Sequence, residues 1–218
     1  MIWGEIKHAI NSRIGTLWFK SLDKIVEEQA HETYYSTMES YVSAYGDNDG
    51  KIFIIPRGTE SIEDGMFNTS QDVRCIVLPN GLKKIGDSAF LNDSIKTIIL
   101  PKSIQTIGEN AFSFSLIKYI DIPEGVSELK NGTFSSCKKL KNIVLPSTLE
   151  VIGGDANFDG LDALESIKIF AKSPPVIEGD FAFDSTDLSG CTLYVPNDSI
   201  DLYKYEPYWS DFGEIIGI

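Results

Sequence analysis

The stretch Ile76-Val77-Leu78-Pro79-Asn80-Gly81-Leu82-Lys83-Lys84-Ile85-Gly86-Asp87-Ser88-Ala89-Phe90 recurs with small changes along most of the chain. Prolines equivalent to Pro79 follow one another at intervals of 22 or 23 residues, at Pro56, Pro79, Pro101, Pro123 and Pro146. A phenylalanine comes eleven residues after each of the first four prolines and twelve after the fifth, at Phe67, Phe90, Phe112, Phe134 and Phe158. A fixed period of this length predicts a stack of similar coils.

Three apolar residues follow each phenylalanine, spaced like L-x-x-L-x-L. They are Val73/Ile76/Leu78, Ile95/Ile98/Leu100, Ile117/Ile120/Ile122, Leu140/Ile143/Leu145 and Leu164/Ile167/Ile169. The last two of each set alternate with a period of two, so both point to the same side of a short strand. A proline directly after the strand ends it, because proline has no N–H to donate. We expect Gly86, Gly108 and Gly153 to permit the turn that follows.

A single coil cannot hide its apolar side chains by itself, so each coil must stack on its neighbours. The L-x-x-L-x-L core and its period resemble leucine-rich repeats. The unit I-x-L-P-x-x-L-x-x-I-G-x-x-A-F, as in Ile76–Phe90 and again in Ile98–Phe112, resembles more closely the BspA-like subclass of bacterial leucine-rich repeats. The resemblance implies an α/β fold: a right-handed solenoid with a parallel β-sheet on its concave face and short 3-10 or extended segments on its convex face. The Asn that usually follows the strand is missing here, so an asparagine ladder is not expected.

The repeats are predicted to fill residues 51–196, as five clear units and one degenerate unit that contains Phe181-Ala182-Phe183. A C-terminal cap is expected at 197–218, because Asp198 or Ser199 can begin a helix. Four apolar residues of this segment could then cover the last layer: Trp209, Phe212, Ile215 and Ile216. The run L-Y-V-P…Y-K…W…F that crosses this boundary is similar to the ending of many BspA-like proteins.

A small helical segment is predicted at residues 1–30, where Trp3, Ile6 and Ile10 have helical spacing. Residues 31–50 are predicted to be a polar linker. The run I-K-H-A-I-N-S-R-I-G-T…F-K-S-L-D-K-I-V resembles N-terminal segments of tail-associated proteins in prophages of Gram-positive bacteria. This resemblance implies an attachment segment that joins the repeats to a virion or another assembly.

Charge and composition narrow the possible partners. The formal net charge is −13 with a pI of about 4.5, which disfavours nucleic acid and anionic membrane surfaces, since both attract Lys and Arg. No apolar run approaches the ~20 residues that span a bilayer, and no signal peptide is visible. The compartment is therefore left open, with a cell surface or a phage particle as the candidates.

The sequence offers no recognisable catalytic or metal-binding motif. His8 and His31 are the two histidines, and no Walker loop, G-x-S-x-G or H-E-x-x-H is present. Asp47-Asn48-Asp49-Gly50 resembles the opening of a calcium loop but lacks acids at the required first and twelfth positions, so a plain turn is the better interpretation. Cys75, Cys137 and Cys191 lack CxxC spacing, and we expect them to pack as small apolar side chains. We therefore predict no enzyme, no cofactor and no metal site.

The candidate binding face consists of strand positions that alternate with the buried ones and so project onto the concave surface. Its outermost column is basic in four consecutive units and ends in an acid: Arg74, Lys96, Lys118, Lys141 and Glu165. Such a stripe could bind an acidic partner; the alternative, which is the commoner origin of charge runs, is solubilising charge along the strands that also deters edge pairing. Tyr119 with Asp121, in the neighbouring columns, is the predicted contact centre, because tyrosine is enriched at binding hot spots.

Two functions are compatible with these features. The first is a scaffold that binds protein or glycan, since BspA-like proteins are commonly surface-associated adhesion or interaction proteins. The second is a structural component of a phage tail with residues 1–30 as the dock. A third, an enzyme, has no motif in its support.

Overall fold

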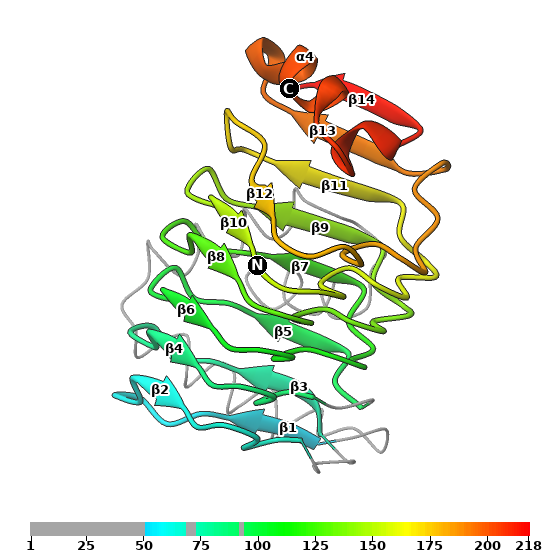
Figure 1. The fold of residues 1–218 in the computed structure, drawn as a ribbon. Coiled ribbons are helices and arrows are strands. Elements are labelled where there is room, and N and C mark those ends of the chain that lie inside the picture. Colours follow the sequence, from blue (N-terminus) through cyan, green and yellow to red (C-terminus); the bar gives the residue numbers. More distant parts are fainter. Residues whose placement is uncertain (1–50, 69–72, 92–93) are drawn as a thin grey trace, which may run out of the picture. The chain divides into compact units, whose positions relative to one another are not determined.

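The computed structural model describes residues 51–218, apart from 69–72 and 92–93 (Figure 1). This part of the chain winds into a parallel-strand β-solenoid of about seven turns with little helix. The predicted solenoid is therefore confirmed. The predicted helical segment at 1–30 and the linker at 31–50 lie outside the described residues.

Each turn of the solenoid from β1 to β12 contributes one longer strand and one strand of two residues, and the turn that begins with β13 continues into the C-terminal segment (Figure 1). The longer strands are β1 (Lys51–Ile54), β3 (Val73–Val77), β5 (Thr97–Ile99), β7 (Tyr119–Asp121), β9 (Asn142–Leu145), β11 (Ser166–Ile169) and β13 (Thr192–Val195). The two-residue strands are β2 (Ser61–Ile62), β4 (Lys84–Ile85), β6 (Thr106–Ile107), β8 (Glu128–Leu129), β10 (Val151–Ile152) and β12 (Val176–Ile177). These short strands are the extended segments that the repeat pattern predicts opposite the main sheet.

The longer strands pair in parallel in the order β1-β3-β5 and, in a second ladder, β7-β9-β11-β13 followed by a C-terminal strand, β14 (Glu214–Gly217). The expected sheet is thus divided between β5 and β7. The coils continue across the division, because the Leu116 amide donates to the Ile95 carbonyl at 2.8 Å and the Phe90 amide donates to the Ala111 carbonyl at 2.9 Å. The division interrupts a ladder and leaves the stack of coils intact.

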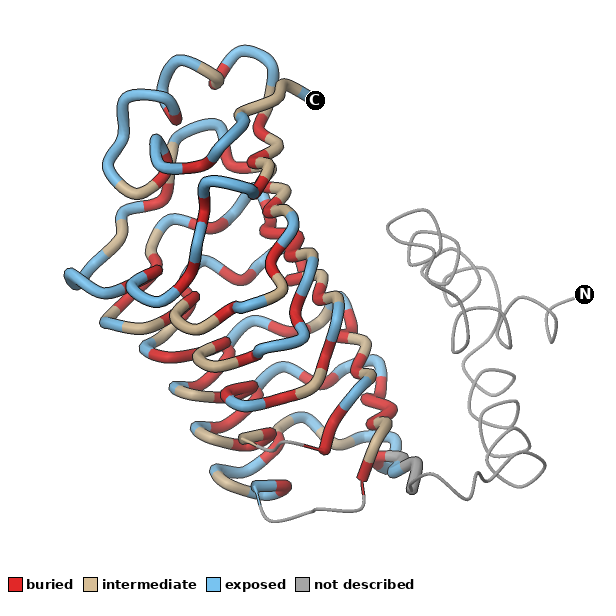
Figure 2. The backbone as a smooth tube through the Cα atoms, turned by 90° about the vertical axis from the view of Figure 1, so that its right-hand side faces the viewer, coloured by how far each residue is buried: buried red, intermediate tan, exposed pale blue. Residues whose placement is uncertain are grey.

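The core is a column of phenylalanines flanked by the apolar triplets. Every residue of the five triplets is buried. The rings stack coil on coil, with centroids 5.5 Å apart for Phe67–Phe90, 5.6 Å for Phe90–Phe112, 5.7 Å for Phe112–Phe134 and 6.2 Å for Phe134–Phe158. Figure 2 shows buried residues recurring at equivalent places in successive turns. The predicted inward direction of the phenylalanines is confirmed.

The degenerate sixth unit extends this column into the C-terminal segment. Phe183 stacks on Phe158 at 4.9 Å and meets Trp209 and Phe212 edge-on at 6.2 and 6.0 Å. The chain reaches them through three helical pieces: η1 (Asn197–Ser199), α4 (Ile200–Tyr205) and η2 (Trp209–Asp211). Strand β14 then pairs with β13 in register. Trp209 and Phe212 are buried, so these aromatic rings lie over the last phenylalanine of the column.

Gly86 and Gly108 have a different role from the one the sequence suggests. Neither these two nor Gly153 has a positive φ; the left-handed backbone of the corresponding turns falls at Ser88, Asn110 and Gly154. Added Cβ atoms at Gly86 and Gly108 would lie 2.5 Å from the Asp64 carboxylate and 2.5 Å from the Asp87 amide, respectively. These glycines are therefore required by the close approach of the preceding coil, and the turn conformation does not depend on them.

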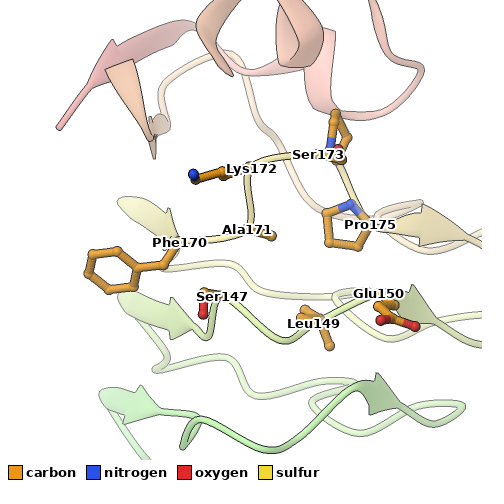
Figure 3. A pocket seen from close by; sticks show the side chains of 9 residues that line it. Ser147, Leu149, Glu150, Phe170, Ala171, Lys172, Ser173 and Pro175 are labelled. Atoms are coloured by element: carbon orange, nitrogen blue, oxygen red, sulfur yellow. The ribbon is translucent and has the colours of Figure 1, made fainter. Parts of the chain in front are cut away.

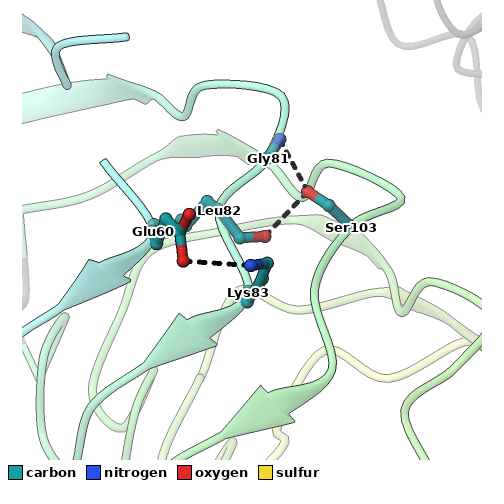
Figure 4. A network of polar contacts seen from close by, with 5 residues as sticks. All are labelled: Glu60, Gly81, Leu82, Lys83 and Ser103. Carbon is teal, nitrogen blue, oxygen red and sulfur yellow. Dashed lines mark hydrogen bonds and ion pairs between the residues drawn. The ribbon is translucent and has the colours of Figure 1, made fainter. Parts of the chain in front are cut away.

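Hydroxyl and carboxylate side chains bridge successive coils, and no asparagine ladder is needed for this purpose. The Gly81 amide donates to the Ser103 hydroxyl at 2.9 Å, and that hydroxyl donates to the Leu82 carbonyl at 2.7 Å (Figure 4). Thr148 repeats this arrangement two coils further on, with Gly125 and Val126 as partners. Each bridge provides hydrogen-bond partners for one amide and one carbonyl in the turn of the preceding coil, outside the strands.

Replacing Phe134 by Ala should lower the free energy of unfolding by about 3–5 kcal/mol, because the cavity would interrupt the aromatic column between two neighbours. Chemical denaturation monitored by circular dichroism measures this change in the free energy of unfolding. Phe114→Ala is the matched control: Phe114 is 53% exposed, so its loss should cost less than about 0.5 kcal/mol. Equal effects of the two substitutions would contradict the importance of the column.

Candidate functional site

The long-strand face, meaning the outward side of β3, β5, β7, β9, β11 and β13, carries the predicted binding columns. Tyr119 pairs with Asn142, which in turn pairs with Ser166, and Ser166 pairs with Thr192. The neighbouring column contains Asp121, Val144, Lys168 and Tyr194 in the same register, but Val144 is buried, as is Val77 in the first ladder, so the expected projection onto the surface is wrong for these two residues. In the first ladder Cys75 pairs with Thr97 and Val77 with Ile99. Strand pairing thus brings together residues that lie 22 to 26 positions apart in the sequence.

Tyr119 and Asp121 begin and end strand β7, and both are half-buried. The buried Ile120 lies between them and faces the core. The phenol oxygen of Tyr119 is itself buried, so a partner would meet other atoms of this side chain rather than its hydroxyl. Asp121 adds a carboxylate two residues further along the same face.

The basic column lies at the start of the long strands. The Lys96 amide donates to the Arg74 carbonyl, and the Lys141 amide donates to the Lys118 carbonyl, both at 2.9 Å. Arg74 is half-buried and its guanidinium donates to the Ser94 carbonyl at 3.3 Å. Lys141 forms an ion pair with Glu165 of the next coil. Lys96, Lys118 and Lys141 are exposed, and like charges on adjacent strands repel one another.

A pocket of about 500 Å³ lies at the opposite ends of the strands, between the turn that follows β9 and the connection that follows β11 (Figure 3). Its lining is mostly apolar and includes Leu149, Phe170, Ala171 and Pro175. Polar side chains come from both connections: Ser147, Glu150, Lys172 and Ser173. Sequence reasoning missed this pocket. The available signal was Phe170, which stands where the other units have proline.

Within residues 51–218, gaps excepted, no three His, Cys, Asp or Glu side chains gather as metal ligands do. Cys137 and Cys191 are buried and Cys75 is half-buried, and all three are free thiols. The expected packing of the cysteines as small apolar side chains is thus confirmed for Cys137 and Cys191. Burial raises the pKa of Cys75 and of Cys137 to about 11.

The fold and the face together define a class of protein: a parallel β-solenoid of short leucine-rich-type coils that presents aligned columns of variable side chains. The family model described as "BspA type Leucine rich repeat region (6 copies)" matches residues 41–165, more than half of the chain. The chain belongs to this family of BspA-type leucine-rich repeat proteins. Leucine-rich repeat proteins are generally interaction modules, and their repeat fold is typically a non-catalytic scaffold.

Several solved structures are similar to this chain. A leucine-rich cell surface protein from Faecalibacterium prausnitzii A2-165 is 19% identical, with a TM-score of 0.35, over 80% of this chain and 62% of its own. A leucine-rich repeat protein from Bacteroides ovatus ATCC 8483 is 20% identical, with a TM-score of 0.37, over 77% of this chain and 60% of its own. The pneumococcal vaccine antigen PcpA is 16% identical, with a TM-score of 0.30, over 77% of this chain and 67% of its own.

The chain thus spans 60% to 62% of the length of the first two of these structures. A comparison with curated proteins finds no match. In the part of the chain that the structure describes, no helix has the length and apolar character needed to cross a membrane.

Native Cys75 and Cys137 should resist alkylation by iodoacetamide at pH 8. The thiolate is the reactive form, and with a pKa of about 11 about one thiol in a thousand is ionised at this pH. Mass spectrometry should find these two cysteines unlabelled in the native protein and labelled in guanidinium chloride. Rapid native labelling of Cys75 would contradict the raised pKa.

Proposed function

We propose that the chain is a non-catalytic interaction module that binds a protein or glycan ligand through its long-strand face. Adhesion or recognition at a bacterial surface is the setting that the family resemblance favours. The repeat fold is typically a non-catalytic scaffold, which supports this proposal. The observation that carries it is the alignment of the columns on consecutive parallel strands.

The basic column supports an acidic ligand. Lysines on adjacent strands repel one another and so destabilise the sheet. The column is therefore a local concentration of positive charge in a protein whose net charge is strongly negative. Glu165 relieves the repulsion at Lys141 by an ion pair. Lys118 forms no ion pair or hydrogen bond through its side chain with any described residue, so its charge is available to a partner. Arg74, Tyr119 and Asp121 complete the proposed contact surface around these lysines.

Reversing Lys96, Lys118 and Lys141 to Glu should weaken binding to an immobilised cell-surface extract by about tenfold or more, chiefly because association becomes slower. The binding that remains should depend less on the salt concentration. The control is Lys84→Glu, Lys102→Glu and Lys204→Glu, which changes the net charge equally at exposed positions outside the column. Surface plasmon resonance at low and high salt measures both variants. Equal affinity of the two folded variants would reject the basic column as the binding surface.

A structural role in a phage-derived particle is the second candidate, and it rests on the resemblance of the N-terminal segment. In this function residues 1–30 attach the repeats to the particle. Deleting them should leave the circular dichroism spectrum of the repeats in place and abolish incorporation into purified particles. A truncated protein still found in particles at the wild-type level would rule this candidate out.

A further inference from the structure

The coil that contains β11 departs from the repeat at the residue after the strand. Lys168 pairs with Val144 and Ile169 pairs with Leu145, so Phe170 takes the position that Pro146 has in the preceding coil. The equivalent prolines of the three coils before that are Pro79, Pro101 and Pro123, and these are buried, as Pro146 is. Phe170 is half-buried, and the Lys168 ammonium lies 5.6 Å from its ring centroid. A contact of this kind helps to fix the orientation of the ring.

The connection after this strand is also longer. Residues 146–150 join β9 to β10, whereas residues 170–175 join β11 to β12, which is one residue more. The two connections are joined near their ends, where the Phe170 amide donates to the Leu145 carbonyl at 3.1 Å and the Val176 amide donates to the Glu150 carbonyl at 2.9 Å. Between these ends the longer connection stands away from the shorter one and leaves the pocket (Figure 3).

The C-terminal segment holds the longer connection in this raised position. The Tyr203 hydroxyl donates to the Ala171 carbonyl at 2.9 Å, and the Trp209 indole N–H donates to the Pro175 carbonyl at 3.3 Å. Both aromatic side chains are fully buried, and burial raises the pKa of Tyr203, so its hydroxyl keeps the proton that it donates. The pocket is therefore formed before any ligand arrives, which lowers the conformational entropy that the protein must lose when a ligand binds.

The chemistry of the pocket combines an apolar lining with two opposite charges. Leu149, Ala171 and Pro175 are buried beneath it, and Phe170 forms one wall. Glu150 and Lys172 lie on opposite sides, each on a different connection (Figure 3). Both side chains are exposed, and neither makes an ion pair or a side-chain hydrogen bond with a residue that the structure describes.

We propose that this pocket is an anchor site for a polypeptide ligand, and that it receives one aromatic side chain flanked by an acidic and a basic residue. The ring would pack against Phe170 and the apolar lining, while Lys172 and Glu150 would each meet a charge of opposite sign. Aromatic side chains that fill a preformed pocket are typical anchors of protein interfaces, and a volume of about 500 Å³ is in the range of ligand pockets.

A glycan is the less suitable occupant. A sugar ring presents hydroxyls around its edge, and each one that is buried needs a hydrogen-bond partner. Most of this lining is apolar. Ser147 is already engaged, because its hydroxyl and its amide both donate to the Glu124 carboxylate, at 2.8 and 3.0 Å. The site is also separate from the basic column, which lies at the other end of the long strands, so either proposal can fail without the other.

The test uses the full-length chain labelled with ¹⁵N and the capped peptides Ac-Asp-Tyr-Lys-NH₂ and Ac-Asp-Ala-Lys-NH₂. The tyrosine peptide should cause saturable shifts at residues 147–150 and 170–175 and at the indole N–H of Trp209, which is bonded to the wall of the pocket. The alanine peptide should bind at least about threefold more weakly, because it lacks the ring. Phe170→Ala should weaken the tyrosine peptide by about three- to tenfold.

Phe114→Ala is the matched control, since it also removes a phenylalanine with an accessible side chain, at a position that does not line the pocket, and it should leave the affinity unchanged. If Phe170→Ala does not fold, the double variant Glu150→Gln with Lys172→Met, which removes both charges, replaces it. Binding of a neutral Ac-Ala-Tyr-Ala-NH₂ peptide should then persist, while the preference for the charged peptide over it is lost. Saturable shifts with chitooligosaccharides and none with the tyrosine peptide would identify a glycan site and overturn the proposal. The absence of shifts with either, or equal binding of the two charged peptides, would overturn it as well.

Discussion

The stacking of one phenylalanine per coil is the interaction on which the rest of the solenoid depends. From Phe67 to Phe158 neighbouring rings are 5.5 to 6.2 Å apart, and each ring is covered by the two coils beside its own. No coil can bury its ring alone, so the repeats are stable only together. The same column continues past the division of the main sheet between β5 and β7. Side-chain packing therefore holds the coils together where the strand hydrogen bonds stop. At the C-terminal end it passes from Phe183 to Trp209 and Phe212.

The close packing of the coils explains where the sequence is constrained and where it is free. Gly86 and Gly108 lie so near the preceding coil that a Cβ atom would collide with it. Ser103 and Thr148 bridge successive turns through their hydroxyls. Apart from the buried Val77 and Val144, outward positions of the long strands carry no such requirement, which leaves them available for recognition, and strand pairing aligns them in columns. A repeat protein can thus change its ligand by changing these columns while its core stays the same.

The two candidate surfaces arise in different ways. The basic column follows directly from the repeat, since the same position in four consecutive coils carries Arg or Lys. The pocket arises from a departure from the repeat: Phe170 in place of proline, and one additional residue before β12. Departures from a regular pattern are commonly found at functional sites, where a local loss of regularity is compensated elsewhere in the structure. Here the C-terminal segment offsets that loss by holding the altered connection through Tyr203 and Trp209.

The sequence by itself determined the period, the inward phenylalanines, the buried triplets and the alignment of the outward columns, because each depends on regular spacing that every coil repeats. Only the tertiary structure decided the role of Gly86, which is set by the distance to another coil. It also decided that Arg74 is half-buried and bonded to Ser94, whereas the sequence had grouped it with exposed lysines. The pocket needed the structure most of all. Its wall, its lining and the aromatic residues that hold it open come from three segments spread over residues 147–209, and no local pattern records how such segments meet.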